Sequence, residues 1–160
     1  LEWFKGGKAT AVGVATGAVV GLVTITPAAG FVTPMGAIAM GAIGSPVSFF
    51  TIQFLARIKT LDDSLDVFAC HGMGGMTGSL LTGVFAAKLA NPGGADGLLY
   101  GSADLMWPQL QGTLAAALLA AVGTAVILYA IKAVMGLRAD DDEEQQGLDT
   151  SQHAEQAYVR

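Results

Sequence analysis

The chain has 160 residues, of which 52% are hydrophobic and only 13% are charged, whereas soluble domains average about 25% charged residues. This composition excludes an ordinary soluble domain and predicts an all-α integral membrane protein whose surroundings are the lipid bilayer. The formal net charge of -5 arises in the acidic segment 139–160, so no basic patch indicates nucleic-acid binding.

Two membrane spans are predicted in the first third of the chain. No charged residue occurs between Lys8 and Arg57, and this gap fits two crossings of roughly 20 residues each. Proline and glycine in the stretch TPAAGFVTP disfavour a helix there, so we predict spans at 9–26 and 34–56. Both spans carry small residues four apart, a spacing that lets helices pack closely in lipid: Gly13, Gly17 and Gly21, then Ala37, Gly41 and Ser45.

A third span, predicted at 64–87, contains the candidate functional residue. Asp63 is expected to cap this helix with Asp66 at the third helical position, where the helix dipole favours negative charge. His71 lies inside the apolar segment, and an ionisable residue within a membrane indicates a substrate or ion pathway. Helical spacing places four residues on the face of His71, namely Val67, Gly74, Gly75 and Gly78.

The alternative for His71 is a structural role, in which the neutral ring donates one hydrogen bond to a neighbouring helix. A metal site is not expected, because Cys70 points to another face and no second intramembrane histidine or carboxylate supplies the remaining ligands of a tetrahedral set. We therefore predict neither a metal nor another cofactor. The single cysteine also cannot form an intramolecular disulfide.

The fourth predicted span, 107–135, is longer than a bilayer requires and is interpreted as a lipid-facing strut. The tail 139–160 follows it, either as an acidic solubilising segment or as a docking segment that folds on binding. Lysine and arginine near the span ends set the orientation, and they predict a cell-membrane protein whose two ends are cytoplasmic. One side collects Lys5, Lys8, Arg57, Lys59, Lys132 and Arg138, and the other has only Lys88.

Three segments in order, GLVTITPAAGFV, LDVFACHGMGG and the tail pattern GLR...EE..GLD.S.H.E.AY, resemble the ammonium transporter (Amt/Mep/Rh) family, bacterial Amt type. The resemblance implies the C-terminal four helices, 8 to 11, of an eleven-helix fold, followed by the cytoplasmic tail. It also implies a homotrimer in which each subunit has its own pore for ammonium or ammonia. The chain begins at Leu1 without a methionine, and we expect it to be a fragment of a longer protein.

Site residues follow from the same resemblance. His71 matches the second of two pore histidines, Val67 would line the cytoplasmic half of the pore, and Asp66 would sit near the inner mouth with a structural role. The tail residues implied for regulation, where P-II-type nitrogen-sensing proteins dock, are Gly147, Asp149, His153 and Tyr158.

The expected function is therefore ammonium transport, with no enzyme activity. Two alternatives stay open at this point. One is a four-span scaffold or assembly subunit without transport, in which His71 is a buried hydrogen-bond partner. The other is an ammonium sensor that reports pore occupancy to a signalling module.

Overall fold

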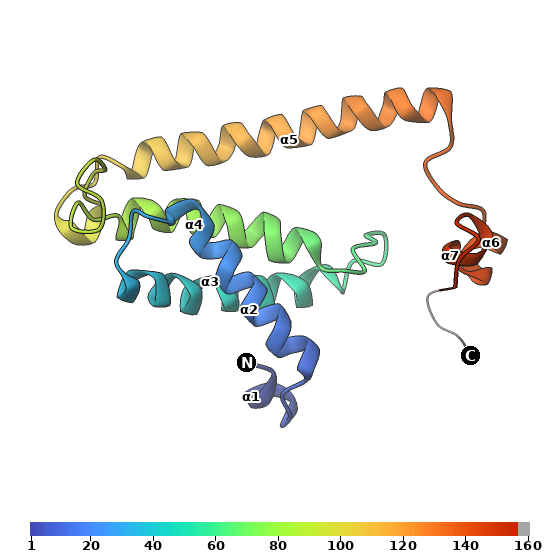
Figure 1. Ribbon diagram of the computed structural model, residues 1–160, viewed down its shortest axis with the longest axis horizontal. Helices are drawn as coiled ribbons and strands as arrows, with labels where there is room; N and C mark the ends of the chain where they lie inside the picture. The colour runs from blue at the N-terminus through green and yellow to red at the C-terminus, as the bar shows by residue number, and fades with distance from the viewer. Residues whose placement is uncertain (157–160) are drawn as a thin grey trace. The chain divides into compact units, whose positions relative to one another are not determined.

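The computed structural model describes residues 1–156, and every regular element in that range is helical (Figure 1). The chain divides into two compact units, Leu1–Ala115 and Ala116–Arg160. The short elements are α1 (Glu2–Gly6), α6 (Asp141–Gln146), α7 (Leu148–Ser151), the 3-10 turns Thr26–Ala28 and Leu98–Tyr100, and the π-helical turn Phe68–Met73. The long helices are α2 (Ala11–Ile25), α3 (Pro34–Leu55), α4 (Gly74–Phe85) and α5 (Met106–Val134).

The first two long helices begin at threonine caps. The side chain of Thr10 accepts a hydrogen bond from the Gly13 N–H at 2.9 Å, and α2 starts at the next residue. Thr33 accepts from the Gly36 N–H at 3.2 Å in the same way, with Pro34 in the first helical position. A capping hydroxyl satisfies an N–H that has no partner within the helix, so these two threonines fix where the helices start.

The core of the first unit forms where α2 meets α3 and α4 (Figure 1). Thr24 of α2 is fully buried there, and its hydroxyl donates to the Val20 carbonyl at 2.8 Å. The contact requires glycine on both partners, since a β-carbon on Gly44 of α3 would overlap the Thr24 side chain and one on Gly78 of α4 would overlap the Thr24 carbonyl oxygen. Small residues therefore let the three backbones approach closely.

The predicted stripe on α2 packs at one end only. Gly21 lies against α3, where a β-carbon on Gly41 would come within 3.8 Å of the Gly21 Cα. Gly17 faces open space, and Gly13 contacts the Glu2 side chain rather than another long helix. The close approaches to α3 and α4 occur instead at Gly44, which meets the Thr24 side chain, and at Gly78, which meets the Thr24 main chain.

Short α1 is held to the ends of α2 and α3 by polar contacts. The Glu2 carboxylate accepts from the Thr10 N–H and from the Thr10 hydroxyl, each at 3.0 Å, and these bonds hold the pKa of Glu2 below its ordinary value of 4.5. Lys5 donates to Gln53 Oε1 at 2.6 Å, and its ammonium lies 5.2 Å from the centre of the Phe50 ring.

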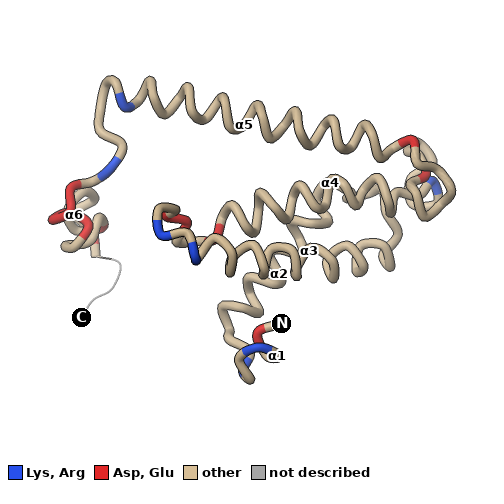
Figure 2. Tube along the Cα trace, turned by 180° about the vertical axis from the view of Figure 1, so that it is seen from behind, with Lys and Arg blue, Asp and Glu red and all other residues tan. Residues whose placement is uncertain are grey.

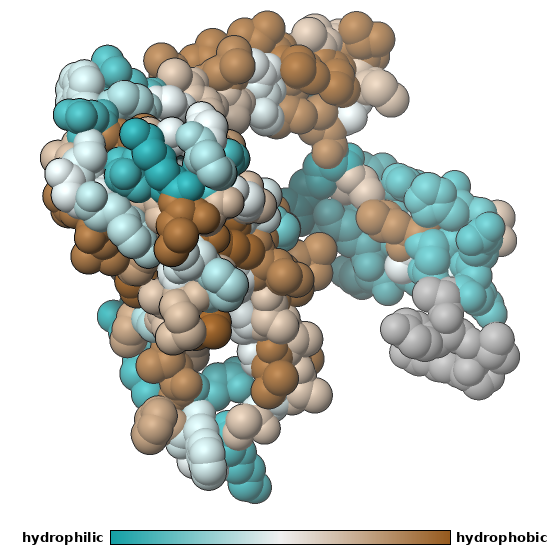
Figure 3. All heavy atoms as spheres, turned by 60° about the vertical axis from the view of Figure 1, so that its left-hand side comes forward, coloured by the Kyte–Doolittle hydropathy of each residue, from teal (hydrophilic) through white to brown (hydrophobic). Residues whose placement is uncertain are grey.

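Three helical segments are long and apolar enough to cross a membrane: Ala11–Ala28, Pro34–Leu55 and Met106–Val134. The helices appear as long uncharged stretches in Figure 2, and hydrophobic side chains cover the residues of α5 in Figure 3, whereas the acidic tail is hydrophilic. None of the α5 residues is buried, and Leu119 is 76% exposed. This exposure is typical of a helix that faces lipid.

The predicted third span is built from two pieces, the π-helical turn Phe68–Met73 and α4. After α4 the chain continues in a segment that leads to α5, and main-chain hydrogen bonds hold this segment in place. The Ala87 N–H donates to the Phe31 carbonyl at 2.9 Å, and the Gly97 N–H donates to the Ala86 carbonyl at 2.8 Å. These bonds hold the end of α4 against the turn between α2 and α3.

Candidate functional site

His71 lies in the π-helical turn Phe68–Met73, directly before α4. The turn is anchored by Asp63, whose two carboxylate oxygens accept from the Val67 N–H at 2.8 Å and the Phe68 N–H at 2.9 Å. A charged acceptor bonded to two main-chain donors is a strong helix start. π-helical turns are rare in proteins, and they occur frequently at functional sites.

The structure corrects the expected position of Asp66. This residue has a φ of +53° and therefore lies outside the helix rather than at its third position. Aspartate tolerates this left-handed conformation better than most residues do. Its carbonyl oxygen accepts from the Cys70 N–H at 2.9 Å, so the main chain of Asp66 supports the turn, while Asp63 supplies the capping carboxylate.

His71 is exposed in this structure, and no hydrogen bond to its ring occurs among residues 1–156. Val67, one turn earlier, is 51% exposed. Phe68 lies beside them, with its ring so close to Gly72 that a β-carbon there would come within 3.1 Å. His71 and Val67 are therefore both exposed on the same turn of the chain.

The prediction that His71 shares a face with Gly74 and Gly78 is wrong. Both glycines are buried, and a β-carbon on Gly74 would lie 3.3 Å from Val23 of α2 and 3.5 Å from the Ser48 hydroxyl of α3. Gly75 alone has open space beside it. The π-helical turn explains why these glycines lie on a different face from the predicted one. Its hydrogen bonds span i to i+5, so the turn contains an additional residue and the 3.6-residue spacing of an α-helix does not apply.

A pocket of about 970 Å³ lies beside this region, lined mainly by α1, α2 and α3. It reaches Asp66 but neither His71 nor Val67. The buried Ser48 side chain also borders it, and the Ser48 hydroxyl has no hydrogen-bond partner within the described residues.

The candidate regulatory residues lie in a folded tail. Gly147 ends α6 with a φ of +99°, a conformation that favours glycine, and a β-carbon there would come within 2.7 Å of an Asp149 carboxylate oxygen. The His153 N–H donates to the Leu148 carbonyl at 3.3 Å. Tyr158 lies outside the described residues.

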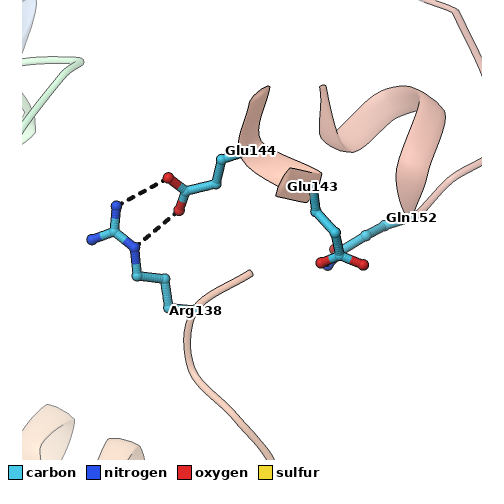
Figure 4. Close-up of polar contacts among 4 residues, drawn as sticks. All are labelled: Arg138, Glu143, Glu144 and Gln152. Carbon is cyan, nitrogen blue, oxygen red and sulfur yellow. Dashed lines mark hydrogen bonds and ion pairs between the residues drawn. The ribbon is translucent and has the colours of Figure 1, made fainter. Parts of the chain in front are cut away.

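Side-chain contacts stabilise this tail (Figure 4). The Arg138 guanidinium makes a two-point contact with the Glu144 carboxylate, with both N···O distances at 3.0 Å. Gln152 donates to Glu143 at 3.0 Å and connects α6 with the segment after α7. The tail is thus organised within residues 138–156, although its composition alone is compatible with disorder.

Within residues 1–156 no group of three or more histidine, cysteine, aspartate or glutamate side chains could hold a metal ion. The sequence reasoning missed a different polar cluster, formed by Ser79, Gln109 and Thr113 between α4 and α5. No sequence motif marks this cluster, because it depends on how two helices meet.

Comparison with known proteins identifies the family. The family model described as Ammonium Transporter Family matches residues 1–158. This chain belongs to that family. Two similar proteins carry the name "Ammonium transporter". The one from Aquifex aeolicus is 48% identical, and the match covers 98% of this chain and 36% of that protein. The one from Bacillus subtilis is 44% identical, and the match covers 99% of this chain and 39% of that protein. The chain therefore spans little more than a third of the length of these relatives.

Solved structures of the Ammonium Transporter Family share the fold. Saccharomyces cerevisiae Mep2 matches with a TM-score of 0.80 and 34% identity over 88% of this chain and 33% of its own. The N240A mutant of Candida albicans Mep2 matches with a TM-score of 0.79 and 34% identity, over 89% of this chain and 32% of the Mep2 chain. The predicted all-α membrane fold and the predicted family are both confirmed.

The anchoring role of Asp63 gives a testable prediction. In the protein expressed from its complete gene, Asp63→Ala should lower the free energy of unfolding by about 1–3 kcal/mol, because two main-chain donors lose a charged acceptor. Thermal unfolding in detergent measures the change. Asp62→Ala is the matched control, since Asp62 is an exposed aspartate with no hydrogen bond or ion pair among the described residues. Equal losses for the two variants would contradict the anchoring role.

Proposed function

We propose that this chain is part of a protein that conducts ammonium or ammonia across the cell membrane, and that it is not an enzyme. The observation that carries the proposal is the family match over residues 1–158, in a chain whose one histidine within the predicted spans lies in a π-helical turn. The relatives from Aquifex aeolicus and Bacillus subtilis, whose printed names are ammonium transporters, support the substrate.

The chemistry of the substrate explains why an imidazole suits this position. Ammonium is charged and strongly hydrated, so an apolar pathway opposes its passage. An imidazole changes its charge near neutral pH and can accept or relay a proton, which would let the nitrogen cross at least partly as ammonia. In this proposal His71 contacts the permeant, and Val67 lines the adjacent stretch of the pathway toward the cytoplasm. Asp66 lies near the inner mouth with a structural role.

The parts of the protein are proposed as follows. Residues 1–138 form the C-terminal four transmembrane helices of the transporter domain, with spans at about 9–26, 34–56, 64–87 and 107–135, and residues 139–160 form a cytoplasmic tail. The distribution of lysine and arginine supports this orientation. The subunits would assemble as a homotrimer, and P-II-type proteins would dock on the cytoplasmic face near Gly147, Asp149, His153 and Tyr158.

The direct test is flux through the protein expressed from its complete gene and reconstituted in vesicles. An imposed ammonium gradient should produce a flux that empty vesicles lack, and sodium and potassium gradients should produce none. If the vesicles carry folded protein and their ammonium flux equals that of empty vesicles, the transport proposal fails. A scaffold or sensor role then becomes the better interpretation.

A further inference from the structure

A polar cluster connects the first turns of α5 to α4. The Ser79 hydroxyl lies 3.0 Å from Gln109 Oε1, and the Thr113 hydroxyl lies 2.8 Å from the Ser79 oxygen. The Thr113 hydroxyl also lies 2.7 Å from the main-chain carbonyl of Gln109, one turn earlier on α5. All three side chains are partly buried, so these contacts are shielded from competing polar groups.

The cluster is part of a continuous interhelical contact. On α5, Met106, Gln109 and Thr113 are spaced by three and four residues and therefore lie along one face. On α4, Gly83 follows Ser79 by one turn and admits the partner helix: a β-carbon there would be 2.9 Å from Met106 Sδ and 3.5 Å from Gln109 Cγ. Glycine thus brings α5 close enough for the polar side chains to meet.

The three side chains form a connected set of hydrogen bonds. The Ser79 hydroxyl donates to Gln109 Oε1, and the Thr113 hydroxyl donates either to the Ser79 oxygen or to the Gln109 main-chain carbonyl. Each hydroxyl therefore has an acceptor, and Gln109 contributes both a side-chain oxygen and a main-chain oxygen.

The rest of α5 gives its orientation little support. From Leu114 to Leu128 only Gly123 and Thr124 interrupt a run of alanine, valine, leucine and isoleucine, and none of α5 is buried. Inside lipid there is no hydrophobic drive between helices, so this apolar run can select a face only through van der Waals packing. Interhelical hydrogen bonds do select a face, because their donors and acceptors would be unsatisfied in hydrocarbon.

We propose that Ser79, Gln109 and Thr113 form a polar lock that fixes the rotation of α5 against α4, with Gln109 and Thr113 as its positioning residues. The lock is inferred from contacts within Leu1–Ala115 and does not depend on the proposed transport of ammonium.

Disulfide cross-linking in membranes tests the lock in the protein expressed from its complete gene, with the native cysteines replaced. A Gly83→Cys/Met106→Cys pair reports the face seen here, because a β-carbon on Gly83 would lie 3.3 Å from the Met106 Cα, and the shorter cysteine at position 106 removes the Met106 Sδ that this β-carbon would meet at 2.9 Å. A Gly83→Cys/Trp107→Cys pair reports a face about 100° around α5, where Trp107 is 64% exposed. The readout is the ratio of the two cross-linking rates.

The first pair should cross-link faster. Adding Gln109→Leu or Thr113→Val should lower the ratio by about three- to tenfold, as expected for the loss of one or two interhelical hydrogen bonds. Thr113→Ser keeps the hydroxyl and should keep the ratio, and so should Gln111→Leu, which changes an exposed glutamine two residues away. An unchanged ratio with both Gln109→Leu and Thr113→Val, or faster cross-linking at position 107 in the parent, would overturn the proposal.

Discussion

Replacing His71 with alanine is expected to lower ammonium flux by about tenfold or more in the protein expressed from its complete gene. A tenfold loss corresponds to about 1.4 kcal/mol of barrier, which is modest for removing a group that handles a proton in an apolar pathway. The folded protein should be recovered in normal amounts, since the ring is exposed and makes no hydrogen bond among the described residues. Flux into vesicles, measured across a range of pH, gives the result.

The matched control is His153→Ala, which removes the chain's other histidine from the tail, where its main-chain N–H donates to the Leu148 carbonyl. That variant should conduct ammonium at the parent rate in the absence of any regulatory protein. If His71→Ala conducts with unchanged rate and unchanged pH dependence, His71 has no role in the pathway. The alternative of a structural histidine predicts instead that His71→Ala lowers the thermal stability.

Replacing Gly78 with alanine is expected to give the largest loss of stability of any single methyl addition on α4. The new β-carbon would overlap the Thr24 carbonyl oxygen and would lie 2.9 Å from the Thr24 carbonyl carbon and 3.1 Å from its Cα. These are main-chain atoms of a fully buried residue, so they cannot move aside without separating α2 from α4. Overpacking of this kind costs about 1–3 kcal/mol and occasionally more. Thermal unfolding in detergent measures the loss.

Gly75→Ala is the control for this prediction, because the same substitution three residues earlier on the same helix meets nothing within 4 Å. It should leave the stability within about 0.5 kcal/mol of the parent or raise it by up to about 1 kcal/mol through helix propensity. Comparable destabilisation by the two alanines would show that Gly78 is not at a close helix contact, contrary to the packing seen here.

The sequence alone determined the membrane class, the family and the approximate extent of the long helices. Hydrophobic run length is set by bilayer thickness, so the span predicted at 34–56 lies close to the observed helix α3, Pro34–Leu55. His71 also stood out, because an ionisable residue is conspicuous among apolar neighbours. These properties are local, and local chemistry is readable from one chain.

The tertiary structure decided the contacts between helices and the register around His71. Regular helical spacing predicted that Gly74 and Gly78 lie beside His71, whereas the π-helical turn places both glycines on the buried side. Asp66 lies outside the helix, and the Asp63 carboxylate accepts from the first N–H groups of that helix. The cluster of Ser79, Gln109 and Thr113 joins residues about 30 positions apart. The crossing of the helices determines which small residues pack together and which polar residues form hydrogen bonds. Helices in lipid associate without a hydrophobic drive, so the hydrophobic pattern of the sequence does not predict these contacts.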